Sequence, residues 1–220
     1  MKSKLIQSGI ALAALIAAPF AAQAADLSPS PAYKAPSYVA PVFTWSGFYT
    51  GVNAGYGWGT SDWTPGPSIS PKGFLGGLTL GYNMQTGIWV WGLEGDFDYS
   101  AIKGTHGCGG GTCKLEDKWF GTARGRIGYA GWNNFMPYLT GGAAFADTKA
   151  TSPAGSKDDW QVGWTFGGGV EYALWSNWSV KAEYLYADLG KMSCGVPCGA
   201  PSTHVTDKLN IVRTGLNYRF

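Results

Sequence analysis

Trp178-Ser-Val-Lys-Ala-Glu-Tyr-Leu-Tyr186 separates its apolar and its charged residues by parity. Trp178, Val180, Ala182, Tyr184 and Tyr186 share one side, and Lys181 and Glu183 take the other. The last residues, 212–220 (Val-Arg-Thr-Gly-Leu-Asn-Tyr-Arg-Phe), repeat the pattern. Because a strand sends successive side chains to opposite faces, each segment predicts a strand with one apolar and one charged face.

The pattern recurs along the chain with no helix signal between its copies. The predicted strands are 45–58, 74–84, 88–99, 119–130, 136–146, 160–172, 178–186 and 212–220. Their apolar faces are rich in Trp and Tyr, which favours lipid contact. We therefore predict an all-β fold, an eight-stranded antiparallel transmembrane up-and-down β-barrel. A soluble sheet can also alternate, so a secreted β-sandwich such as a lectin is the competing fold.

The composition agrees with a barrel that has a lipid face and a packed interior. Charged residues make up 14% of the chain and aromatic residues 15%, and there are 34 glycines. Such a chain is neither disordered nor strongly basic. No internal apolar run reaches the ~18 residues that a membrane-spanning helix needs.

The N-terminus indicates export. Lys2 and Lys4 precede an apolar run that ends at Ala22-Gln-Ala24, so residues 1–24 predict a signal peptide cleaved after Ala24. Residues 25–43 contain four prolines and predict an extended periplasmic linker, followed by the barrel over 44–220. Removing Lys2 and Lys4 from the 16 basic residues leaves 14, equal to the 14 acidic residues. This balance indicates no nucleic-acid partner.

The connections between the predicted strands alternate between short and long. Outer-membrane barrels have short periplasmic turns and longer extracellular loops, so the N-terminus is expected in the periplasm. Aromatic residues near the strand ends predict two girdles at the membrane interfaces. The periplasmic girdle would hold Trp45, Trp89, Trp132, Trp175 and Trp178, and the external one Trp58, Tyr99, Trp119, Trp160 and Tyr186.

Ten charged residues take the inward parity. They are the acids Glu94, Asp96, Asp98, Glu171 and Glu183 and the bases Arg124, Arg126, Lys181, Arg213 and Arg219. Charges in a narrow interior are costly unless they are paired. An eight-stranded barrel is just wide enough for its inward side chains to fill. We expect lumen ion pairs that close the interior; a narrow ion path is the alternative.

Four cysteines form two close pairs in predicted loops, Cys108 with Cys113 and Cys194 with Cys198. In an oxidising compartment they are disulfide candidates, while a shared zinc site, free thiols or pairing between loops stay open. The two histidines, His106 and His204, fall in predicted external loops. No nucleophile motif accompanies them, so no catalytic, cofactor or metal residue is assigned.

Five stretches resemble the alphaproteobacterial outer-membrane β-barrel (porin-family) surface proteins. They are 43–58 (FTWSGFYTGVNAGYGW), 94–98 (EGDFD), 121–129 (GTARGRIGY), 137–142 (PYLTGG) and 215–220 (GLNYRF). The resemblance implies a barrel similar to the OmpA transmembrane domain and an abundant surface protein, sometimes credited with haemin binding or adhesion. Leu216, Tyr218 and Phe220 resemble the signal that the barrel assembly machinery reads. The two cysteine pairs depart from the family pattern.

These observations predict a non-enzymatic structural protein of the outer membrane of a Gram-negative bacterium, without a cofactor. Its expected partners are outer-membrane lipid and lipopolysaccharide and the barrel assembly machinery, and it is expected to be a monomer. A narrow porin or a haemin-binding surface receptor is the alternative function.

Overall fold

The computed structural model describes residues 43–64, 68–108, 111–152, 155–175, 177–193 and 204–220. The expected signal peptide and all but Phe43 of the expected linker lie outside these residues. The strands are β1 (Gly47–Thr64), β2 (Ser68–Ile69), β3 (Lys72–Thr86), β4 (Trp89–Cys108), β5 (Gly111–Tyr129), β6 (Phe135–Ser152), β7 (Gly155–Trp175), β8 (Trp178–Ser193) and β9 (His204–Arg219). The described part of the chain contains no helix long and apolar enough to cross a membrane.

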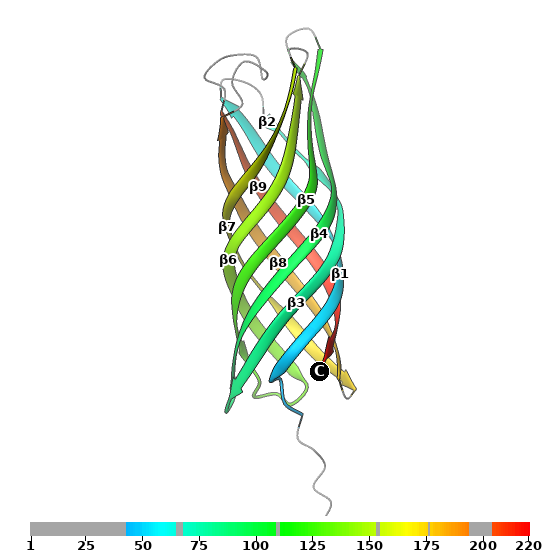
Figure 1. The fold of residues 1–220 in the computed structure, drawn as a ribbon, viewed down its shortest axis with the longest axis vertical. Coiled ribbons are helices and arrows are strands. Elements are labelled where there is room, and N and C mark those ends of the chain that lie inside the picture. The colour runs from blue at the N-terminus through cyan, green and yellow to red at the C-terminus, as the bar shows by residue number, and fades with distance from the viewer. Residues whose placement is uncertain (1–42, 65–67, 109–110, 153–154, 176, 194–203) are drawn as a thin grey trace, which may run out of the picture. The chain divides into compact units, whose positions relative to one another are not determined.

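Eight long strands close into an antiparallel barrel, with the two-residue β2 added beside β1 (Figure 1). Each long strand pairs with its neighbour in the chain, and β1 also pairs with β9. The partner of Thr50 is Leu80, and the row of partners continues around the barrel through Trp164 and Lys208. It returns to β1 at Thr60, ten residues beyond its start, so the strands are strongly tilted. The predicted eight-stranded up-and-down barrel is confirmed.

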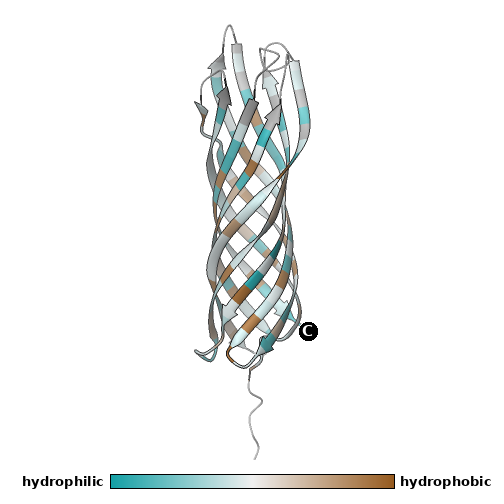
Figure 2. Cartoon of the chain, turned by 90° about the vertical axis from the view of Figure 1, so that its left-hand side faces the viewer, coloured by the Kyte–Doolittle hydropathy of each residue, from teal (hydrophilic) through white to brown (hydrophobic). Residues whose placement is uncertain are grey.

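The predicted alternation decides which face each side chain takes. Hydrophobic and hydrophilic segments alternate along the strands in Figure 2. On the outer face, Leu93 is 72% exposed and Leu78 is 65% exposed, although both are large apolar side chains. Their inward neighbours Glu94 and Thr79 are buried. A charged interior beneath an apolar exterior is the inverse of a water-soluble barrel, and it suits a lipid surrounding.

The strands run further than the sequence pattern predicted at the long-loop end. The third predicted strand ended at Tyr99, whereas β4 continues to Cys108 and pairs with β5 up to Gly111. The expectation that Cys108 and Cys113 lie in a loop is therefore wrong, because both are in strands. Outside the lipid zone the outer face has no need of apolar residues, so alternation fades while the backbone ladder continues.

The short-turn end carries both described ends of the chain. Residues 87–88 reverse the chain between β3 and β4, close to the gap at 85–87 between two predicted strands, with Gly87 at a φ of 61°. The Phe220 amide donates to the Phe48 carbonyl (3.0 Å). Trp45, expected in the periplasmic girdle, is only 1% exposed and packs inside with Val90 and Met136. That girdle prediction was wrong for Trp45 because this residue precedes β1 and turns into the barrel mouth.

Candidate functional site: the charged interior of the barrel

The inward side chains form layers along the barrel axis. β4 shows the order, with Val90 at the short-turn end, then Glu94, Asp96 and Asp98, and then Ile102. On β9 the same layers follow one another from the short-turn end, with Asn217, Arg213, Ile211 and Asp207. A charged layer therefore lies between two apolar layers, and a second polar layer follows at the long-loop end. Nine of the ten predicted inward charges are buried in the charged layer.

Two arginines hold the acids of β4 and β8. The Arg124 Nη2 atom lies 2.5 Å from Glu94 Oε1, and its Nη1 lies 3.1 Å from Glu183 Oε2. Arg213 donates from Nε to Glu183 Oε1 (2.5 Å) and from Nη1 to Asp98 Oδ2 (2.9 Å), and it also contacts Asp96. The Arg124–Glu94 and Arg213–Glu183 pairs join adjacent strands. The contacts of Arg124 with Glu183 and of Arg213 with Asp98 join strands that are not neighbours, so they cross the lumen.

A second group lies nearer the short-turn end. Arg126 Nη2 donates to Glu171 Oε2 (2.7 Å), and Lys181 Nζ donates to Glu94 Oε2 (2.9 Å). The Tyr49 hydroxyl donates to the same Glu94 oxygen (2.7 Å). The Arg126 guanidinium lies 4.1 Å from the centre of the Tyr138 ring. Glu94 thus joins the two groups into one network.

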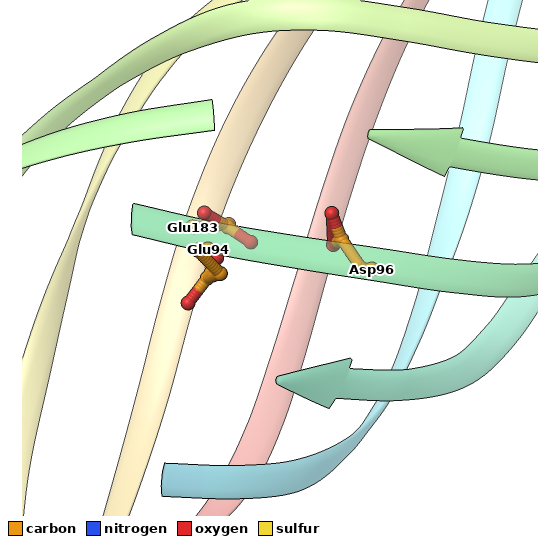
Figure 3. A group of neighbouring side chains, drawn as sticks. All are labelled: Glu94, Asp96 and Glu183. Carbon is orange, nitrogen blue, oxygen red and sulfur yellow. The ribbon is translucent and has the colours of Figure 1, made fainter. Parts of the chain in front are cut away.

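Three carboxylates of this network, Glu94, Asp96 and Glu183, lie within 4.8 Å of one another. Figure 3 shows Glu94 next to Glu183, with Asp96 further along β4. Such a cluster can hold a metal ion, but here Arg124 contacts all three acids and Arg213 contacts two of them. Guanidinium groups supply the positive charge that a cation would bring, so the arrangement favours a structural network.

Arg219 departs from the expected set of lumen ion pairs. Its guanidinium lies 4.2 Å from the centre of the Phe43 ring, at the short-turn rim, and makes no ion pair within the described residues. The expectation that Arg219 pairs inside the lumen is therefore wrong, because the strand end places it beside aromatic rings. Without it, five buried carboxylates face four buried cations. The network therefore contains one more carboxylate than cations.

The apolar layers were not expected from the sequence. Above the charged layer, ten buried apolar residues fill the interior: Leu75, Ile102, Phe120, Ala144, Ala146, Leu185, Ala187, Leu189, Leu209 and Ile211. Their signal was present, since apolar residues at both parities predict burial on both faces. It was weak because five of these residues lie outside the predicted strands and the other five lie within three residues of a predicted strand end. They are a water-excluding layer on the long-loop side of the ion network.

Beyond this apolar layer, Asp117 and Asp207 face the interior of the extended strands. Thr148 donates to Asp117 (2.7 Å), and Ser61 and Gln161 donate to Asp207. On the outer face the adjacent Lys118 is exposed, which places this layer outside the hydrocarbon zone. Burial, followed by repulsion from Asp207, raises the pKa of Asp117 to about 7. Burial also raises the pKa of Asp207.

The other predicted residues lie apart from the network. The side chains of Cys108, Cys113 and His204 and the whole of Cys194 and Cys198 lie outside the described residues. His106 is exposed on β4, and β9, which begins at His204, is separated from β4 by β1 and β3. The assembly-signal residues lie on β9 and at its end: Leu216 is 39% exposed, Tyr218 is half-buried and Phe220 is 74% exposed.

The fold and its charge distribution define an outer-membrane β-barrel protein. Residues 10–220 match the family described as the outer membrane protein beta-barrel domain, and the chain belongs to that family. It is 35% identical over 251 residues to the 31 kDa outer-membrane immunogenic protein of Brucella melitensis, covering 100% of both chains. It is 33% identical over 184 residues to a 22 kDa outer membrane protein of Rhizobium leguminosarum, covering 83% of this chain and 81% of that protein. The expected resemblance is confirmed.

One solved structure shows the same fold. Neisserial surface protein A matches with a TM-score of 0.52 and 19% sequence identity, over 80% of this chain and 98% of that one. At this identity the likeness concerns the barrel alone.

Proposed function

We propose that this protein is a non-enzymatic structural component of the outer membrane, with a lumen closed by its own side chains. The observation that carries the proposal is the ion network, which spans the interior from β4 and β5 to β8 and β9. Each of its nine charged groups has a partner of opposite charge, although Asp98 Oδ1 and Arg126 Nε have no hydrogen-bond partner within the described part of the chain. Arg124 and Arg213 each contact a carboxylate on an adjacent strand and another across the lumen.

Three features support closure rather than conduction. The charged layer contains arginines in contact with several acids, which fixes their side chains. Trp45 and Met136 lie below it, and Phe120 and Leu209 lie above it. An ion crossing the barrel would have to displace paired charges and pass two apolar layers, and both steps are costly.

The same geometry supports one orientation in the membrane. The short turns and the C-terminal Phe220 share one end, and the extended hairpins β4–β5 and β6–β7 project from the other (Figure 1). In outer-membrane barrels the short turns are periplasmic. The projecting hairpins would then be extracellular and carry the contacts with the environment. The barrel would act as a monomer, with membrane lipid and lipopolysaccharide around it, after insertion by the barrel assembly machinery.

Planar-bilayer recordings test the closed lumen. Purified protein should give no conductance steps. A variant that still folds but lacks both arginines and a large side chain of each apolar layer, Arg124→Ala/Arg213→Ala/Trp45→Ala/Phe120→Ala, should leak ions. Heat-modifiable migration on a gel reports folding in each case. Steady conductance steps in the unsubstituted protein would contradict the proposal. Surface proteolysis of intact cells tests the orientation, with cuts expected in the β4–β5 connection and not at the 87–88 turn.

A further inference from the structure

Three lysines lie on the outer face of the successive strands β3, β4 and β5, next to the aromatic girdle at the long-loop end. Lys72 on β3 is the direct partner of Trp58 on β1, and on its other side it faces Lys103 on β4. Lys118 on β5 directly precedes Trp119, and a register shift there leaves both side chains exposed. We call Lys72, Lys103 and Lys118 the lysine row.

The lysine row lacks the acids that would balance it. Lys72 and Lys118 have no ion-pair partner among the described residues, and Lys103 has only the exposed Glu116 at 3.6 Å. Lys72 and Lys103 are also direct cross-strand partners. Like charges placed opposite each other destabilise a sheet unless an anion lies between them. The position therefore suits a negatively charged group from outside the protein.

Below the lysine row the same strands form an apolar trough in the outer wall. A hollow of about 210 Å³ lies between Phe97, Trp119, Phe145 and Trp160. A second, of about 500 Å³, follows at Leu80, Leu93 and Ala123, and a third, of about 650 Å³, shares Leu93 with it. The trough thus descends from the aromatic girdle along the lipid-facing side of β3 to β7.

Small outward residues produce this trough. They are Gly95, Gly121, Ala123, Gly125, Gly141 and Ala143, on three adjacent strands. The fold does not require glycine at Gly95 or Gly125, since an added Cβ would lie 3.7 Å and 3.9 Å from its nearest neighbours. Inward glycines differ, because a Cβ at Gly142 would collide with the backbone of Ala123. The small residues leave space on a lipid-facing surface where larger apolar residues would also fit.

We propose that the lysine row and the trough together bind one phosphorylated lipid of the outer leaflet. Its phosphate groups would lie against Lys72, Lys103 and Lys118, and its acyl chains would run down the trough past Phe97 and Gly125. Juxtamembrane lysines attract anionic headgroups, and buried acyl chains add apolar contact. This inference rests on the proposed position in the outer membrane, and it goes further by assigning a lipid class and its residues.

Native mass spectrometry of the full mature protein, released from detergent, tests the site. The probe is lipid A carrying both phosphates, compared with the same lipid after enzymatic dephosphorylation and with inorganic phosphate alone. The unsubstituted protein should retain lipid A and lose most of it when the phosphates are removed. Inorganic phosphate alone should not be retained, because it cannot use the trough.

Two variants separate the row from the trough. Lys72→Gln/Lys103→Gln/Lys118→Gln should weaken retention about tenfold or more. The matched control Lys149→Gln/Lys191→Gln/Lys208→Gln removes the same charge from β6, β8 and β9 and should change retention far less. Gly125→Leu/Gly141→Leu fills the trough and should also weaken it.

Equal retention by the row variant and its control would overturn the inference, as would undiminished binding of the dephosphorylated lipid. Retention at the unsubstituted level by Gly125→Leu/Gly141→Leu would remove the trough from the site. Heat-modifiable migration and silent bilayers should persist in all these variants. A loss of either in the unsubstituted protein would contradict the proposed function instead, so the two failures are distinguishable.

Discussion

Glu183 contacts both Arg124 and Arg213, and Glu183→Gln tests how much this double contact stabilises the barrel. Its oxygens lie 2.5 Å from Arg213 Nε and 3.1 Å from Arg124 Nη1, and the Tyr138 hydroxyl donates to it at 3.2 Å. The substitution keeps the side-chain volume and removes the charge. It leaves two buried guanidinium groups short of a partner. Breaking such buried pairs costs about 3–5 kcal/mol.

Asp98→Asn is the matched control, because it removes the same charge from the same layer. Among the described residues Asp98 contacts one cation, Arg213 at 2.9 Å, and an amide oxygen can still accept that hydrogen bond. Either substitution leaves four acids facing the four cations. The net charge of the layer is therefore the same in both variants. They differ in how many arginines the lost acid contacted. Losing charge at a single hydrogen bond should cost about 1 kcal/mol.

Urea unfolding of the barrel in lipid vesicles, followed by tryptophan fluorescence, measures the difference. With a urea dependence of about 2 kcal/mol per molar, Glu183→Gln should lower the midpoint by roughly 2 M and Asp98→Asn by roughly 0.5 M. Equal midpoints for the two variants, or a larger loss for Asp98→Asn, would refute the reasoning. Removal of the excess acid would then matter more than the number of cations that the lost acid contacted.

Three further outcomes are expected. Gly142→Leu should abolish refolding, seen as lost heat-modifiable migration, whereas outward Gly125→Leu should refold; equal yields would contradict the packing. Burial holds the pKa of Asp117 at about 7 in the folded state, above its ordinary 3.8, so its contribution to stability is full below pH ~4 and is lost as the pH rises through 7. Urea midpoints should be higher at pH 5 than at pH 8, and Asp117→Asn should reduce that difference; an unchanged difference would assign it to other groups. Deleting Phe220 should lower the amount of barrel in outer-membrane fractions, and normal amounts would exclude it from the assembly signal.

The barrel was predictable because lipid outside and charge inside impose one rule on every strand. The parity of Lys181 and Glu183 in the opening stretch holds in the structure, and so does that of Glu94 and Arg124. Strand pairing followed from chain order, since short turns join neighbours. Both features depend on the local sequence alone.

The contacts across the lumen and the residues at the rim could not be predicted, because they depend on the tilt of the strands and on where each strand ends. The tilt of the strands brings Arg124 of β5 to Glu183 of β8. Pairing between adjacent strands does not predict this contact. The apolar layer at Ile102 and Leu209 lies beyond the amphipathic pattern. Arg219 and Trp45 were misplaced because both lie at the rim, where alternation no longer decides direction.

In the proposed arrangement, lipid covers the tryptophan-bearing exterior while the interior is sealed from it. Two variants that each retain a single tryptophan, with the others changed to Phe, test this in vesicles of brominated lipid. Trp164, 53% exposed on the outer face, should lose most of its fluorescence relative to vesicles of ordinary lipid. Trp45, 1% exposed inside the barrel mouth, should keep its fluorescence. Equal quenching of the two, or a protected Trp164, would contradict the account.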